Sequence, residues 1–196
     1  MTRHKGAANP EPKLPDVLRP GLNIVFCGSA AGAASARAGA YYAGPGNKFW
    51  DVLHRTGLTP RRLAPAAFPL LPDFGIGLTD MAKHYAGADA GIRRAHDDPA
   101  ALKAKIVRFR PAVLAFNGKR AARAFVGHGV DYGRLDSTLS GTVLFVLPST
   151  SGAAARYWDE VPWRTVAALS RSIRRALADG RPMPSHGDRR PISDPS

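Results

Sequence analysis

Four short apolar runs dominate the hydrophobic pattern of this chain of 196 residues. Each run is five or six residues long, is rich in Val, Ile, Leu or Phe, and lies close to Gly, Pro or Asn. Continuous apolar runs of this length are typical of strands buried on both faces, as in a parallel sheet. The predicted strands are Leu22–Cys27, Gly75–Thr79, Ala112–Phe116 and Thr142–Leu147.

Apolar residues at helical spacing lie between and after these runs. One predicted helix ends before Pro111, because the residue preceding a proline is pushed out of the helical region, and another ends at Gly180. Strands that alternate with helices predict an α/β fold around a central, mostly parallel, four-stranded sheet. The helical stripes are Phe49, Trp50 and Leu53; Leu102, Ile106 and Phe109; and Val166, Leu169, Ile173 and Leu177.

The length of the chain favours one domain. Segments 1–20 and 179–196 are polar and rich in proline, so we predict two flexible tails around a folded domain at 21–178. The first residues lack the apolar segment of a signal peptide, and no run is long enough for a membrane helix, so a cytoplasmic protein is expected.

The charge balance favours a polyanionic partner. Lys and Arg number 28 and Asp and Glu number 15, which gives a formal net charge of +13. Nucleic acid is the first candidate and an acidic membrane surface the second, beside the plainer reading of a soluble basic protein. Cys27 is the single cysteine, so no internal disulfide can form, and its apolar neighbours predict a buried thiol. No histidines have metal-ligand spacing, so no metal is expected.

Small and polar residues follow all four predicted strands. Parallel sheets bind ligands at the carboxyl ends of their strands, so we expect the site there. The loops are Gly28–Ser35; the segment with Asp80, Lys83 and His84; Asn117–Arg120; and Pro148–Gly152.

Each loop also has an ordinary structural interpretation. The small residues of Gly28–Ser35 let a backbone approach a ligand, but they also occur where a helix packs tightly on a sheet. The hydroxyls of Pro148–Gly152 could hold phosphates or could form an ordinary capped turn. Phe49 and Trp50 belong to a helical stripe and are expected in the core, whereas Tyr42 lies outside it and is a candidate platform for a planar base.

Together these segments resemble the mismatch-specific uracil/thymine DNA glycosylases, a branch of the uracil-DNA glycosylase superfamily. The resemblance implies a three-layer α/β/α fold and a monofunctional enzyme that initiates base excision repair. Such an enzyme flips uracil out of single- or double-stranded DNA and hydrolyses its N-glycosidic bond without a cofactor. It also implies a monomer associated with the nucleoid. The matching stretches are Leu22–Gly28, Tyr42–Trp50, Gly57–Pro60, Gly75–Asp80 and Val146–Gly152.

The resemblance assigns roles to individual residues. Tyr42 matches the aromatic residue that stacks on the extruded base, and Gly28, Ser29 and Ala30 lie in the motif whose backbone lines the uracil pocket. Ser35 matches a serine near the pocket and the phosphate and is a catalytic candidate together with Asp80 and Asn117. The DNA-binding candidates are Ser149, Ser151 and Gly152, whose motif pinches the DNA backbone, Ala153 near the position of the wedge that fills the vacated stack, and Arg156, which would assist this small wedge.

Ala30 is the main departure from the family pattern. The mismatch-specific branch usually carries an asparagine there to position the attacking water, and alanine has no polar side chain. Asp80 is the candidate replacement, and Asn117 is a second pocket residue with the donor and acceptor that a uracil edge requires. The alternatives are a helix cap for Asp80 and a turn-former for Asn117.

Three functions therefore remain open. The first is a uracil-DNA glycosylase, and the second is a protein that binds uracil or abasic DNA without hydrolysis, which the alanine at position 30 favours. The third is a basic α/β protein that acts on nucleotides or another small anion.

Overall fold

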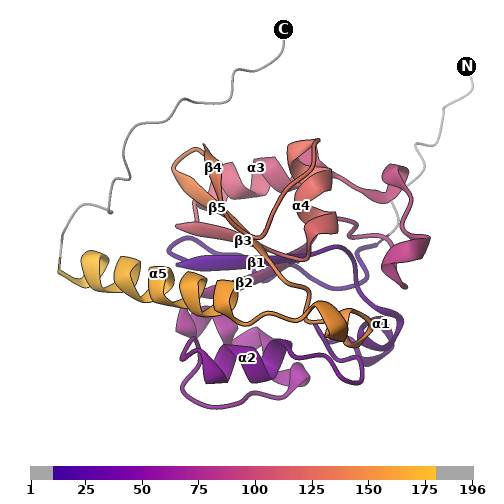
Figure 1. Ribbon diagram of the computed structural model, residues 1–196, viewed down its shortest axis with the longest axis horizontal. Helices are drawn as coiled ribbons and strands as arrows, with labels where there is room; N and C mark the ends of the chain where they lie inside the picture. The colour runs from indigo at the N-terminus through magenta and orange to yellow at the C-terminus, as the bar shows by residue number, and fades with distance from the viewer. Residues whose placement is uncertain (1–10, 180–196) are drawn as a thin grey trace, which may run out of the picture.

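The computed structural model describes residues 11–179 and shows a central sheet covered by helices on both faces (Figure 1). The five strands lie in the order β2-β1-β3-β5-β4, and all neighbours pair parallel except β4 and β5. The predicted α/β class and mostly parallel sheet are confirmed, whereas the predicted number of four strands is wrong. The strands are β1 Ile24–Gly28, β2 Ile76–Asp80, β3 Val113–Asn117, β4 Gly133–Leu139 and β5 Thr142–Leu147.

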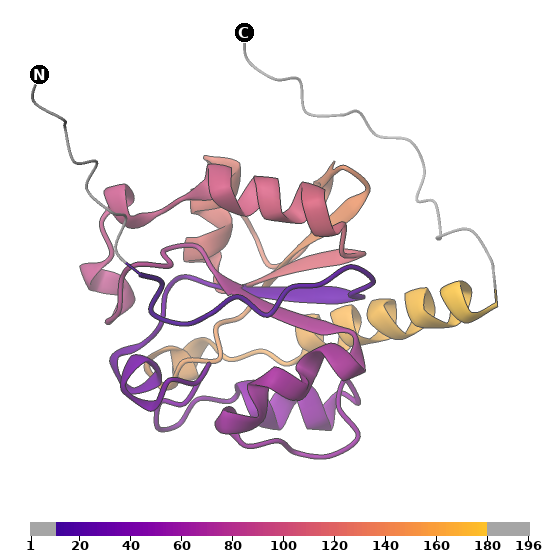
Figure 2. The same cartoon turned by 180° about the vertical axis from the view of Figure 1, so that it is seen from behind.

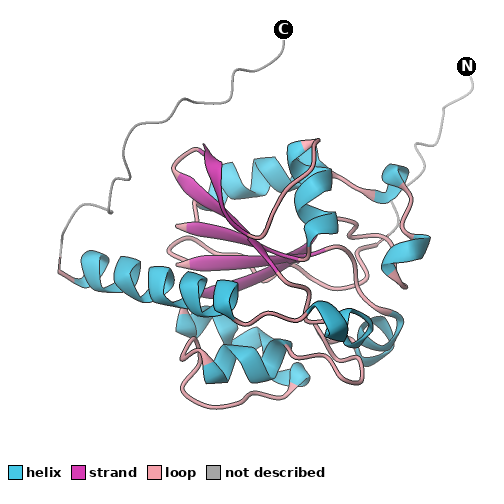
Figure 3. Cartoon of the chain, viewed as in Figure 1, coloured by secondary structure: helices cyan, strands magenta, loops and turns pink. Residues whose placement is uncertain are grey.

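The helices form an outer layer on each side of the sheet (Figure 3). Helices α3 and α4 cover one face, and α2 and α5 cover the other (Figure 1). The α-helices are α1 Ala33–Ala38, α2 Phe49–Arg55, α3 Pro99–Phe109, α4 Lys119–Val126 and α5 Val161–Ala178. Short 3-10 segments are η1 Pro65–Phe74, η2 Asp89–Gly91, η3 Arg94–His96 and η4 Gly152–Tyr157.

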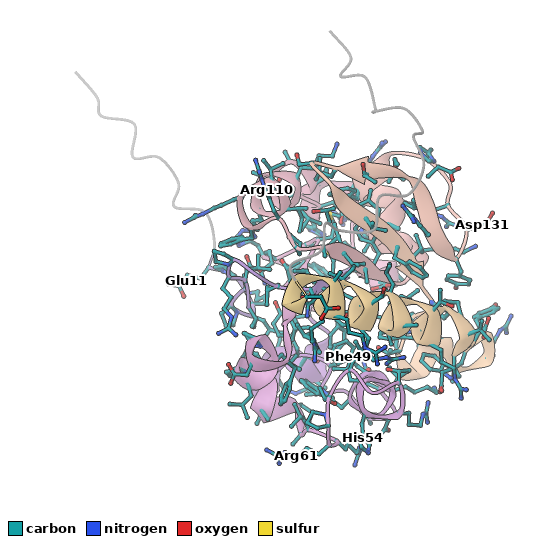
Figure 4. All side chains as sticks on the ribbon, turned by 90° about the vertical axis from the view of Figure 1, so that its left-hand side faces the viewer. Glu11, Phe49, His54, Arg61, Arg110 and Asp131 are labelled. Atoms are coloured by element: carbon teal, nitrogen blue, oxygen red, sulfur yellow. The ribbon has the colours of Figure 1, made fainter. Side chains whose placement is uncertain are left out.

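Alternate residues of each central strand enter the two halves of the core. Ile24 and Phe26 pack toward α2 and α5, whereas Val25 and Cys27 pack toward α3 and α4. This two-sided burial explains why the central strands are apolar throughout. Cys27 is a buried free thiol, as predicted. Phe49, the first residue of α2, is buried in the core, whereas Figure 4 shows charged side chains such as Arg61 and Asp131 at the periphery.

Strand β4 lies at one edge of the sheet and was not predicted from the sequence. Along Gly133–Leu139 half-buried residues alternate with exposed ones, so this strand has no continuous apolar run. It turns into β5 through Ser140 and Gly141, which have φ values of 48° and 86°. Two successive positive φ values form the tight hairpin turn whose twist matches that of the flanking strands.

Part of the segment that begins at residue 11 packs against the folded domain, which corrects the predicted tail at 1–20. Leu14 is buried in the core, and Val17 exchanges two backbone hydrogen bonds with Leu78, at 2.9 and 3.0 Å. These contacts cover the outer edge of β2, which would otherwise be open to pairing with another chain. The folded unit therefore starts before residue 21. The rest of the predicted tails, at 1–10 and 180–196, lies outside the described residues.

The topology fixes where a ligand can enter. The chain leaves β1 toward β2 on one side and leaves β3 toward β5 on the other, so the direction of the connections reverses between β1 and β3. Open α/β sheets bind ligands at the carboxyl ends of the strands beside such a reversal. In the described part of the chain, no helix is long and apolar enough to span a membrane.

Candidate active site

A cleft of about 640 Å³ opens at the carboxyl ends of β1, β2, β3 and β5. Its walls come from the loops that follow these strands and from the turn at 41–47. Helix α1 and segment η4 lie beside each other next to this edge in both ribbon views (Figures 1 and 2). Within residues 11–179, no group of three or more His, Cys, Asp or Glu side chains is arranged to hold a metal ion.

The cleft brings together residues that the sequence places more than a hundred positions apart. Every predicted site residue lines it except Arg156, whose guanidinium instead lies 4.5 Å from the ring centre of Tyr157. Their roles stay predictions, but the shared location fits the rule that guided their choice. The residues are Gly28, Ser29, Ala30, Ser35, Tyr42, Asp80, Asn117, Ser149, Ser151, Gly152 and Ala153.

Asp80 and Tyr42 converge above the backbone of Gly28. A Cβ atom built on Gly28 would lie 2.5 Å from the Asp80 carboxylate oxygen Oδ1 and 3.3 Å from the Tyr42 hydroxyl. Gly28 and Asp80 are also partners in the parallel register of β1 and β2, which brings the two strand ends together. A side chain at position 28 would therefore displace the carboxylate, and glycine is required by this close approach.

Asp80 is a buried carboxylate, with an exposed fraction of 4%. Burial raises its pKa from 3.8 to about 6, and the charge of Lys83 partly opposes this rise. A helix cap, the alternative role for this residue, is not what the structure shows. Asp98 caps α3 by accepting a hydrogen bond from the Ala101 N–H at 2.8 Å, whereas Asp80 ends β2 inside the cleft.

Tyr42 lines the cleft with its ring stacked on Phe49. The ring centres are 4.0 Å apart and the planes differ by 26°, so Phe49 supports the tyrosine from the core. The Tyr42 backbone has a φ of 54°, a left-handed conformation that is uncommon for a large side chain and often marks a functional site.

The Tyr42 hydroxyl is buried and has no hydrogen-bond partner of normal geometry among the described residues, although the Asn117 side chain lies near it. Burial and the charge of Asp80 raise its pKa well above its usual value, so the phenol stays neutral. Buried polar groups nearly always find a partner, so a hydroxyl without one in a cleft indicates that a ligand can supply the bond.

Asn117 and Ser35 brace the walls of the cleft. The Asn117 amide donates to the Thr150 hydroxyl at 2.8 Å and accepts from the Thr150 N–H at 3.0 Å, which ties the end of β3 to the loop after β5. An amide has one further N–H and one further lone pair, so Asn117 can still bind a ligand. The Ser35 hydroxyl accepts from the Ala43 N–H at 3.0 Å and holds the turn that carries Tyr42.

Tyr157 and Asp89 belong to the cleft residues that the sequence candidates did not include. Tyr157 lines the cleft with an exposed fraction of 60%, and Asp89 accepts a hydrogen bond from the Ser29 hydroxyl at 3.3 Å. Burial raises the pKa of Asp89. The signal for Tyr157 was an aromatic residue directly after Arg156 and close to the serine-rich turn, whereas Asp89 lies in a segment without any pattern.

Comparison with known proteins identifies the family. A sequence profile described as Uracil DNA glycosylase superfamily matches residues 15–171, which is most of the chain. The fold is similar to the solution NMR structure of a protein from Methanosarcina acetivorans, titled a "putative Uracil DNA glycosylase". That similarity has a TM-score of 0.53 at 24% sequence identity and covers 81% of this chain and 95% of the other. The chain therefore belongs to the uracil DNA glycosylase superfamily.

Proposed function

We propose that this protein is a monofunctional DNA glycosylase that takes uracil out of the DNA stack and hydrolyses its N-glycosidic bond. Membership of the superfamily supports glycosylase chemistry on DNA. The resemblance to the mismatch-specific branch and the net charge of +13 support a uracil substrate and a polyanionic partner.

The observation that carries the proposal is the convergence of Asp80 and Tyr42 over Gly28 in the cleft. A flipped base that stacks on the Tyr42 ring would lie beside Asp80, the buried carboxylate that ends β2. The nearly side-chain-free loop from Gly28 lets backbone N–H groups approach the base closely.

Each group has a chemical task in this proposal. The backbone of the Gly28 loop stabilises the negative charge that develops on the departing uracil. The ionised Asp80 carboxylate stabilises the cation-like sugar or orients the attacking water. It thereby takes over the role of the amide expected at position 30. Asn117 offers a donor and an acceptor to the base edge, and the Tyr42 ring stacks on the face of the base.

Tyr157 is the better candidate for filling the gap that the flipped base leaves. Ala153, the residue at the expected wedge position, carries only a methyl group. The Tyr157 ring is 60% exposed at the cleft and is flanked by the Arg156 guanidinium. Aromatic side chains stack on nucleic-acid bases irrespective of sequence, and an adjacent arginine adds attraction to the phosphates.

A second function, binding of uracil or abasic DNA without hydrolysis, is favoured by Ala30. This residue lines the cleft without a polar side chain that could position water. The two functions differ in their products, because only the enzyme releases free uracil and leaves an abasic site.

Single-turnover excision from a uracil-containing duplex, without added metal, tests the proposal. Wild-type protein is expected to release uracil, and Asp80→Asn to be slower by about 10²–10³-fold, the usual effect of removing one electrostatic group. Asp131→Asn is the matched control, since Asp131 is fully exposed at the surface. Tight binding without any uracil release would establish the second function, and full activity of Asp80→Asn would remove Asp80 from the mechanism.

A further inference from the structure

A buried ammonium group lies directly beneath the cleft and has no part in the mechanism above. Lys83 has an exposed fraction of only 8%, although lysine is almost never buried without charged partners. Its Nζ lies 2.9 Å from the Asp16 carboxylate, donates to the Tyr41 hydroxyl at 2.9 Å, and lies 4.0 Å from Oδ2 of Asp80.

Asp16 holds this ammonium from the N-terminal segment. Oδ1 of Asp16 forms the ion pair with Lys83 and accepts a hydrogen bond from the Thr79 hydroxyl at 2.8 Å. Oδ2 of Asp16 lies 2.6 Å from Nζ of Lys105. Burial alone would raise the pKa of Asp16, but Lys83 and Lys105 outweigh it and hold the pKa below the usual value. Asp16 is therefore ionised wherever the protein is folded near neutral pH, and it draws Lys83 to one side of Asp80.

The charges around Asp80 come from few groups. Lys83 on the same loop is the nearest cation and favours the ionised carboxylate, whereas Asp16 disfavours it and Lys105 on α3 weakly favours it. The neighbouring Cys27 thiol and the Tyr42 and Tyr41 hydroxyls stay neutral, because burial raises the pKa of each well above its usual value. Burial is the largest influence on the pKa of Asp80 and raises it, and Lys83 is the nearest charge that opposes this rise.

We propose that Lys83, held in place by Asp16, is a positioning residue that keeps Asp80 ionised at working pH. This inference deepens the proposed function, on which it rests. It assigns the segment around Asp16 to the active site. The ion pair between Asp16 and Lys83 then determines the pH below which the rate of uracil release falls. Lys83 acts through Asp80 and does not itself contact the substrate.

Two substitutions are expected to move the titration of Asp80 in opposite directions. Lys83→Met removes the nearest cation, so the midpoint should rise by about one to three pH units, the usual effect of a close opposite charge. Asp16→Asn removes an anion and leaves Asp80 as the remaining carboxylate for Lys83, so the midpoint should fall. A residue that only stabilised the fold would lower activity without moving the midpoint.

The test follows the Asp80 carboxyl carbon by NMR across pH in the whole protein, together with the pH profile of single-turnover uracil release. Lys103→Met is the matched control, because Lys103 lies on α3 near the Phe125 ring and away from this network. Asp16→Asn keeps the size of the side chain and one oxygen that can accept from the Thr79 hydroxyl, although it loses the contact with Lys105, so it decides the test if Lys83→Met does not fold.

Opposite shifts in the two variants, with no shift in Lys103→Met, would support the inference. A midpoint that stays at the wild-type pH in both variants would overturn it. The NMR titration needs no activity, so shifted midpoints in a protein that releases no uracil would contradict the proposed function and leave the network standing.

Discussion

Glycine at position 28 is the residue on which the site geometry depends most. We expect Gly28→Ala to abolish uracil release, because its Cβ would come within 2.5 Å of the Asp80 carboxylate and would push that group and the Tyr42 hydroxyl apart. Gly129→Ala is the control, since its Cβ would meet nothing within 4 Å, its φ is not left-handed and it does not line the cleft. Single-turnover rates of the two variants check this, and equal rates would show that the close approach is irrelevant to catalysis.

The ionised Asp80 carboxylate, which the proposed reaction uses, is expected to lower the free energy of unfolding because it is buried. Its pKa is about 6 in the fold against the usual 3.8, so the folded chain binds a proton more tightly than the unfolded chain. The contribution of this side chain to stability is therefore lost as the pH rises from about 4 to about 6.

At about pH 8 we expect Asp80→Asn to be more stable than wild type by up to about 3 kcal/mol in the free energy of unfolding, and therefore to unfold at a higher urea concentration. The difference should vanish at pH values below about 4, where Asp80 is protonated in both states. Urea titrations at the two pH values measure this. A variant less stable than wild type at the higher pH would show that the ionised carboxylate is stabilising.

At the scale of elements, the β4–β5 hairpin tests how the edge of the sheet is held. Ser140 has a φ of 48°, a conformation that asparagine and glycine adopt more easily than serine. Ser140→Asn should raise the free energy of unfolding by a few tenths to about 1 kcal/mol, and Ser140→Val should lower it by about 1 kcal/mol. Thermal unfolding of the pair measures this, and a Ser140→Val protein as stable as Ser140→Asn would contradict the turn geometry.

Strands buried on two faces could be predicted from the sequence, and the strand buried on one face could not. The apolar runs that became β1, β2, β3 and β5 start or end within two residues of the observed strands. Strand β4 has a water-facing side, so Arg134, Asp136 and Thr138 break any continuous run. The segment around Leu14 contains prolines and charges typical of a tail, and only tertiary contacts hold it.

The candidate site could be predicted to the level of its loops but not its electrostatics. The carboxyl ends of the strands identified Asp80, Asn117 and the serine-rich turn, since topology alone brings them together. The pairing of Lys83 with Asp16 joins residues 67 positions apart through side chains, and no spacing in the sequence signals such a contact.

At the scale of the whole molecule, the charge of +13 predicts DNA binding that weakens steeply with salt. Each phosphate neutralised by Lys or Arg releases counterions, so the affinity should fall by about a hundredfold or more between about 50 and 200 mM salt for several contacts. Fluorescence anisotropy with a labelled uracil-containing duplex measures this slope. Affinity that does not change with salt would contradict binding through phosphates.

The central claim is that an extruded uracil lies in the cleft against the ring of Tyr42, beside residue 80. The most direct measurement is a crystal structure of the Asp80→Asn protein bound to a uracil-containing duplex. The account predicts the base out of the stack, enclosed by the Gly28 loop and Asn117, with Tyr157 at the gap in the helix. DNA bound on another face, or a uracil that stays paired inside the helix, would contradict it.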